Sequence, residues 1–182
     1  MSNGELIYPY VEGEYGINPT LLQPTETPRI ILSASGRPLN FWMTDKEIYI
    51  GEVDPSIFRM FAHVARGILT LDLKTKDIAF SERPQRHPDL YAERFVNLAL
   101  RHFQNCQTPV NFFRGDWKPG TDNFNSFMEA VALGQDNVTA ARNTWSGKTL
   151  GKHGFSKISA ENISKNYEDG MQAEITALFE RV

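Results

Sequence analysis

Cations and small polar residues cluster between residues 142 and 153 of this 182-residue chain, while residues 137–160 contain no Asp or Glu. A helix that begins at Thr144 or Ser146 would place free backbone N–H groups and the positive end of its dipole beside these cations. The pattern predicts an anion site for phosphate or a nucleic-acid backbone, with Trp145 as a stacking surface. The binding residues expected here are Arg142, Thr144, Trp145, Ser146, Lys148 and Lys152.

A second polar group lies between residues 114 and 123, where a turn is expected to leave a buried strand and lead into a helix. Asp116 or Asp122 would act there as a general base, and Arg114 or Lys148 would stabilise developing negative charge. Strand ends and helix starts are where functional groups gather on a rigid base. His153 is the best exposed histidine for proton transfer. The predicted catalytic residues are therefore Asp116, Asp122 and His153.

Each of these residues also has a purely structural interpretation, which stays open. The cationic segment is then a capped helix with a solvated lysine face, Trp145 in the core and Gly154 as its end. In the same interpretation, Asp116 caps a turn, Asp122 caps a helix, and Arg114 pairs with one of the two acids.

The spacing of glycines and histidines and the number of cysteines argue against several common kinds of site. The run from Ser146 to Thr149 reads SGKT, but a P-loop needs a glycine where this chain has Arg142. No histidine pair has metal-ligand spacing, and the single cysteine, Cys106, excludes an intramolecular disulfide and a cysteine-based zinc site. Cys106 is expected to be an inert thiol. We expect neither a metal nor another cofactor.

The composition is that of a folded domain, with 41% hydrophobic and 23% charged residues and a formal net charge of −3. This charge disfavours a protein whose whole surface binds nucleic acid. No apolar run approaches the roughly 20 residues of a membrane span, and no signal peptide opens the chain. We expect a soluble protein, either cytoplasmic or delivered by a secretion system that needs no cleavable signal.

Strand and helix patterns together predict an α+β fold: an antiparallel sheet built from hairpins, with two main amphipathic helices packed on one face. Residues 1–28 form an acidic, proline-containing arm, with four Glu and no Lys or Arg, ahead of a single globular domain over residues 29–182. Strands are expected over residues 29–34, 39–44, 47–53, 68–74, 77–80 and 110–113. Helices are expected over residues 55–66, 89–105, 121–133 and 137–141, followed by the cationic helix. Asp169-Gly170 predicts a terminal hairpin.

The second half of the chain carries a family resemblance. A helix ending in ALRHF, an aromatic strand, a DW turn and the run DNFNSFMEAVALGQDNVTAARNTWSGKTLGKHGF together resemble a domain at the carboxyl ends of bacterial polymorphic toxins and of related stand-alone effectors. The resemblance implies an effector or toxin-associated module and supplies no activity. Its matching elements are Asp122-Asn123, Phe127, Gly134, Ala140-Ala141, the run from Thr144 to Lys148, and Gly154-Phe155.

Two functions follow from these patterns. In the first, the chain is a toxin-type enzyme that acts on a phosphate-bearing substrate, RNA or a nucleotide, in a cationic cleft between residues 114–123 and 144–153. In the second, it is a non-catalytic module of a toxin or conflict system that binds a protein partner, and the same polar residues are caps.

Overall fold

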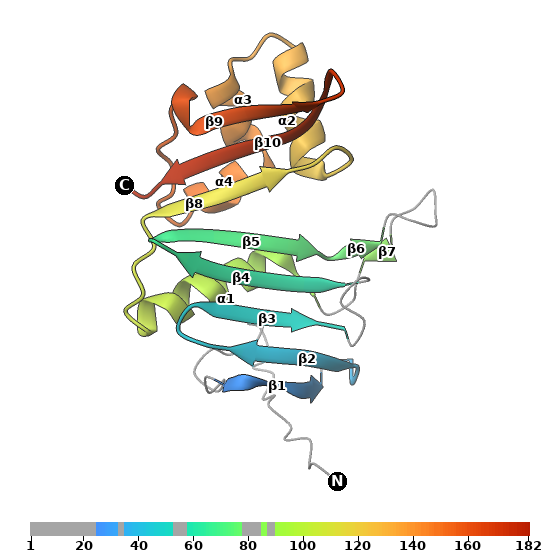
Figure 1. The fold of residues 1–182 in the computed structure, drawn as a ribbon, viewed down its shortest axis with the longest axis vertical. Helices are drawn as coiled ribbons and strands as arrows, with labels where there is room; N and C mark the ends of the chain where they lie inside the picture. The colour runs from blue at the N-terminus through green and yellow to red at the C-terminus, as the bar shows by residue number, and fades with distance from the viewer. Residues whose placement is uncertain (1–24, 33–34, 53–57, 78–84, 87–89) are drawn as a thin grey trace. The chain divides into compact units, whose positions relative to one another are not determined.

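The computed structural model describes residues 25–32, 35–52, 58–77, 85–86 and 90–182 and has the predicted α+β class (Figure 1). The chain divides into two compact units, which we describe separately. Unit 1 holds residues up to Ala65 and residues 71–109, and unit 2 holds residues 66–70 and 110–182. Most of the predicted acidic arm, residues 1–24, lies outside the described residues.

Unit 1 contains an antiparallel meander. Strands β1 (Thr25–Leu32), β2 (Pro38–Met43), β3 (Glu47–Gly51) and β4 (Arg59–Ala65) pair in chain order. Residues 25–28 of the predicted arm are thus part of β1. Side chains alternate along β2, where Leu39, Phe41 and Met43 are buried. The strands predicted over residues 29–34, 39–44 and 47–53 are confirmed where they are described.

The helix predicted over residues 55–66 is wrong, because residues 59–65 form β4. Met60, Ala62 and Val64 are buried and their neighbours are not, which is the two-residue period of a strand. Arg66 and Gly67, at φ 52° and 75°, then make the tight reversal that precedes β5 (Ile68–Lys74). Gly67 therefore belongs to a hairpin turn, where the sequence suggested the end of a helix.

The strand predicted over residues 77–80 as the hairpin partner of β5 falls mostly outside the described residues. Asp77, which is described, belongs to β6 (Lys76–Asp77) and pairs with Gln85 of β7 (Gln85–Arg86).

Helix α1 (Ala92–Asn105) forms the helical layer of unit 1 and contacts β4. Its buried residues follow the predicted helical spacing and include Phe95, Ala99 and Phe103. His102 is also buried, and its Nε2 lies 2.5 Å from the carbonyl oxygen of Thr44. A core histidine of this kind ties the helix to the turn between β2 and β3.

Cys106 lies just beyond α1 and is half-buried. Burial raises the pKa of its thiol, and the negative charge of Asp45 raises this pKa further. We therefore expect iodoacetamide at pH 8 to alkylate Cys106 more slowly in the folded chain than in the chain unfolded by urea, because less thiolate is present. Asp45→Asn removes the smaller of the two causes and should speed the reaction. Equal rates in the folded and unfolded chains would contradict this expectation.

Unit 2 combines a small sheet with three helices. Strand β8 (Phe112–Trp117) pairs antiparallel with β10 (Met171–Glu180), and β10 pairs antiparallel with β9 (Ile163–Glu168). Residues 68–70 of β5 run parallel to the start of β8. Asp169 and Gly170, at φ 50° and 75°, connect β9 to β10, which confirms the predicted terminal hairpin. A 3-10 turn, Ala160–Asn162, precedes β9.

Helices α2 (Asp122–Ala132), α3 (Asn137–Asn143) and α4 (Trp145–Gly151) lie together on one side of these strands (Figure 1). The sequence offers two possible caps for each of the first two helices, Thr121 or Asp122 for α2 and Asp136 or Asn137 for α3, and the N-caps in the structure are Thr121 and Asp136. Backbone and side-chain hydrogen bonds from Thr139 lower the pKa of the Asp136 carboxyl.

Because α1 and α2 belong to different units, the packing of both on a single face stays a prediction.

The core of unit 2 lies between its helices and its strands. Trp117 of β8 packs between Phe127 of α2 and Phe179 of β10, with ring centroids 6.0 and 6.4 Å away. At the outer strand β9, Lys165 turns toward the same core, and its Nζ lies 5.4 Å from the centroid of the Phe127 ring. This unit contains every residue of the predicted site.

Candidate functional site

Arg114 and Asp116 lie within strand β8, so the turn predicted at residues 114–117 is wrong. The Nε of Arg114 donates to both carboxylate oxygens of Asp116 at 2.9 Å. The Oγ1 of Thr176, opposite Asp116 on β10, donates to Oδ1 of the same carboxylate at 2.7 Å. Asp116 is therefore held by an ion pair and a cross-strand hydrogen bond.

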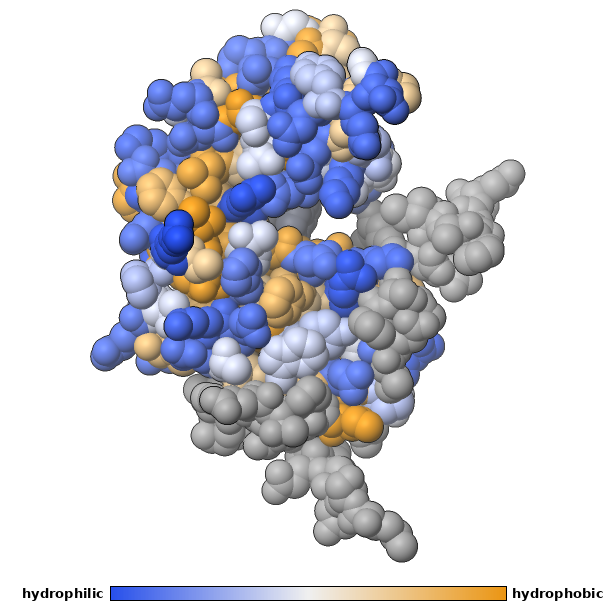
Figure 2. All heavy atoms as spheres, viewed as in Figure 1, coloured by the Kyte–Doolittle hydropathy of each residue, from blue (hydrophilic) through white to orange (hydrophobic). Residues whose placement is uncertain are grey.

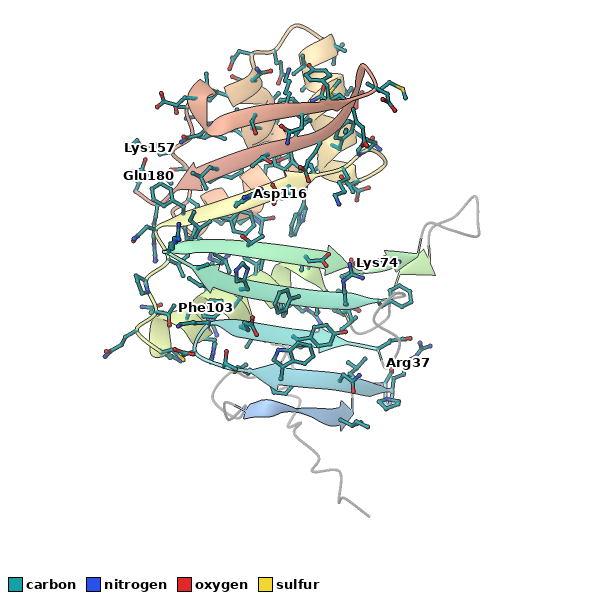
Figure 3. All side chains as sticks on the ribbon, viewed as in Figure 1. Arg37, Lys74, Phe103, Asp116, Lys157 and Glu180 are labelled. Carbon is teal, nitrogen blue, oxygen red and sulfur yellow. The ribbon has the colours of Figure 1, made fainter. Side chains whose placement is uncertain are left out.

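The alternation of β8 separates Asp116 from the helices. Trp117 points into the core beneath α2, and Asp116, one residue earlier, points to the other face of the strand. Figure 3 labels Asp116 on β8. Figure 2 shows this face of unit 2, with hydrophobic side chains gathered near the end where β8 begins. The structure therefore does not bring Arg114 and Asp116 together with the cationic residues of α4.

The first turns of α2 and α4 are joined by a reciprocal pair of hydrogen bonds. The Nδ2 of Asn123 donates to Oγ of Ser146 at 2.8 Å, and the backbone N–H of Ser146 donates to Oδ1 of Asn123 at 3.0 Å. Ser146 is 5% exposed, so this contact is internal. It uses one of the backbone N–H groups that the predicted anion site would have offered.

Thr144 forms the corner between α3 and α4 and is fully buried. It is the C-cap of α3 and also the N-cap of α4. Its Oγ1 donates to the carbonyl of Ala141 at 2.7 Å and accepts from the N–H of Gly147 at 3.1 Å. The N–H groups of Ser146 and Gly147 are both bonded within the unit, so neither is open to a phosphate.

Gly147 lies where α4 meets the end of α3. A Cβ at this position would contact the carbonyl oxygen of Ala141 and would lie 2.6 Å from the carbonyl oxygen and 2.7 Å from the Cα of Arg142. Real Cβ atoms do not approach backbone this closely. The glycine of the SGKT run is thus explained by helix packing.

The predicted cations, by contrast, lie on the surface. Trp145, Lys148 and Lys152 follow one another at helical spacing on the exposed side of α4, whereas Ser146, Thr149 and Leu150 are buried on its other side. Arg142 is exposed at the end of α3. We call Arg142, Trp145, Lys148 and Lys152 the cationic helix surface. Trp145 is 37% exposed, so the interpretation that buried it in the core is not the observed one.

Two predicted catalytic residues remain. Asp122 is the first residue of α2 and is exposed, and Thr121 rather than Asp122 caps the helix. Its carboxylate lies near the positive end of the α2 dipole, where negative charge is favourable. His153 follows α4 and is half-buried, and its backbone N–H donates to the carbonyl of Leu150.

Lys157 shows how a cation of the same segment can be neutralised. Its Nζ lies 2.6 Å from a carboxylate oxygen of Glu180, and the two backbones are bridged by a pair of hydrogen bonds (Figure 3). Arg142 and Lys148 make no ion pair with any residue that the structure describes. The charges of Arg142 and Lys148 are therefore not neutralised by an ion pair with a described residue, whereas that of Lys157 is.

Among the described residues, no three His, Cys, Asp or Glu side chains lie close enough together to hold a metal ion. None of the helices in the same part of the chain is long and apolar enough to cross a bilayer. Comparisons of the chain with protein-family models, with curated proteins and with solved structures find no match.

Proposed function

We propose that this chain is a non-catalytic module that binds a protein partner, within a toxin or conflict system as its resemblance implies. The observation that carries the proposal is that one candidate catalytic residue, Asp116, and one candidate binding residue, Ser146, are already hydrogen-bonded inside the fold. Asp116 is held by Arg114 and Thr176, and Ser146 is held by Asn123. A general base must be within reach of a substrate proton, and a nearby cation must be free to meet developing charge.

The separation of the candidate groups also supports a binding role. An enzyme of the predicted type needs a carboxylate and a cation in one cleft. Here Asp116 and helix α4, which carries Lys148, lie on different faces of β8, whereas the other candidate carboxylate, Asp122, is exposed at the start of α2. Exposed Trp and Arg residues, in contrast, are the types most often enriched at protein interfaces.

Expression of the full chain in a bacterial host tests this proposal. We expect growth equal to that of a host carrying an empty vector, and intact total RNA after incubation with the purified chain, because Asp116 does not share a face of β8 with the cations of α4. Growth arrest that is relieved by Asp122→Ala or Lys148→Ala, with an unchanged melting temperature, would overturn the proposal in favour of the enzyme. Arg101→Ala, on the exposed side of α1 in unit 1, is the matched control and should not alter growth.

A further inference from the structure

We infer that the cationic helix surface, formed by Arg142, Trp145, Lys148 and Lys152, is the contact surface for an acidic protein segment that also carries an apolar or aromatic side chain. The inference rests on the proposed function and names its surface and its kind of partner. It follows from the exposed side chains of this surface, from the absence of an ion pair between Arg142 or Lys148 and a described residue, and from the backbone amides that are already hydrogen-bonded.

Helical geometry places the anchor residues together. Trp145 and Lys148 lie on α4, and Lys152 is its C-cap in a helical backbone conformation, so the spacing of three and four residues projects their side chains from one face. Arg142 precedes the corner at Thr144, and the first turn of α4 lies directly against its backbone, as the environment of Gly147 shows. The surface thus presents one flat aromatic ring among cations.

The cations of this surface indicate that the partner carries negative charge where it binds. Arg142 and Lys148 form no ion pair with a described residue, and residues 137–160 contain no acid. The whole chain, however, carries a formal net charge of −3. The positive charge of this surface is therefore local, and it favours a partner that places negative charge opposite it.

The hydrogen bonds at the start of α4 favour a protein over a nucleic acid as the partner. Phosphate sites at helix starts rely on open backbone N–H groups. The N–H of Ser146 is bonded to Asn123, and that of Gly147 to Thr144. Side-chain cations and an indole ring remain, and these suit carboxylates and apolar side chains of a protein. Trp145 would contribute buried area, and the cations would set orientation and rate of association.

A random copolymer of Glu and Tyr is a suitable probe, because it offers carboxylates and aromatic rings on a polypeptide. Binding to the full chain is followed by fluorescence anisotropy at 50 and 200 mM NaCl. We expect saturable binding that weakens with salt. Trp145→Ala and Lys148→Glu should each raise the Kd about tenfold, since an anchor and an opposed charge are lost. Arg101→Glu, an exposed cation on α1, makes the same charge change and should alter the Kd less than about twofold.

Three results would overturn the inference. The first is no binding of the copolymer to the wild-type chain at 50 mM NaCl. The second is an equal loss of affinity in Lys148→Glu and Arg101→Glu, which would indicate attraction by overall charge. The third is tighter binding of polyuridylate than of the copolymer, which would assign the surface to nucleic acid. All variants alter exposed side chains, and their melting temperatures should match that of the wild type.

The two proposals can fail separately. If expression leaves growth unaffected and Lys148→Glu leaves binding of the copolymer unchanged, the chain is still a binding module and the surface is elsewhere. If expression arrests growth, the binding function itself fails, whatever the copolymer does.

Discussion

Gly147→Ala should lower the free energy of unfolding by about 3 kcal/mol, at the upper end of the usual cost of overpacking. The new Cβ would meet three backbone atoms of Ala141 and Arg142, two of them at 2.6 and 2.7 Å. Backbone cannot rotate aside as a side chain can, so α3 and α4 must move apart. For a chain of this length, the melting temperature should fall by roughly 6–12 °C. Urea unfolding followed by Trp fluorescence measures the effect.

Gly151→Ala is the matched control, because it lies in the same helix and its Cβ would meet nothing within 4 Å. Alanine has the higher helix propensity, so this change should be neutral or should stabilise the chain by up to about 1 kcal/mol. If the two variants are equally unstable, the close approach of the backbone at Gly147 is not the cause of the loss.

Asn123→Leu should lower the free energy of unfolding by about 2–4 kcal/mol. The substitution leaves the N–H and Oγ of Ser146 without partners, and each such buried group costs about 1–3 kcal/mol. The contact also joins the first turns of α2 and α4, so its loss should loosen the helical layer. Thermal unfolding combined with hydrogen exchange at Ser146 measures both effects.

Asn123→Asp separates hydrogen bonding from side-chain size. A carboxylate still accepts from the N–H of Ser146 and also accepts from its hydroxyl, and it lies near the positive ends of two helices. We expect this variant to remain within about 1 kcal/mol of the wild type at pH 7. A loss as large as that of Asn123→Leu would show that the reciprocal hydrogen bonds contribute little.

The sequence identified the elements whose signals are local. The apolar spacing of α1, the cap positions of α2 and α3 to within one residue, and the Asp169-Gly170 turn all depend on residues within a few positions of each other. In each case the signal comes from backbone chemistry that tertiary contacts did not override.

The helix predicted over residues 55–66 and the turn predicted at residues 114–117 are wrong for a different reason. In residues 58–65, apolar side chains at positions 58, 61 and 64 fit a helix, and those at 60, 62 and 64 fit a strand, so a short run does not decide between the two periods. Gly115 suggested a turn in the next strand. It lies instead beneath the indole of Trp117, whose Nε1 would be 2.7 Å from an added Cβ. A glycine that makes room for a ring looks, in sequence, like a glycine that bends the chain.

The candidate site was hardest to predict because it depends on residues far apart in the chain. Asn123 belongs to the polar group between residues 114 and 123. Its hydrogen bond with Ser146, which lies 23 residues later, cannot be predicted from residue spacing or from composition. The same is true of Thr176 and Asp116, which are 60 residues apart. The exposed spacing of Trp145, Lys148 and Lys152 could be found from the sequence, because it lies within one helix.

Lys165 has a consequence for how this protein behaves at high concentration. Strand β9 ends the sheet of unit 2, and such an outer strand invites a neighbouring molecule to add a strand of its own. The ammonium group above Phe127 would lose its water if a neighbour closed over it. A buried cation without a partner is costly, so this lysine discourages fibre growth along that edge.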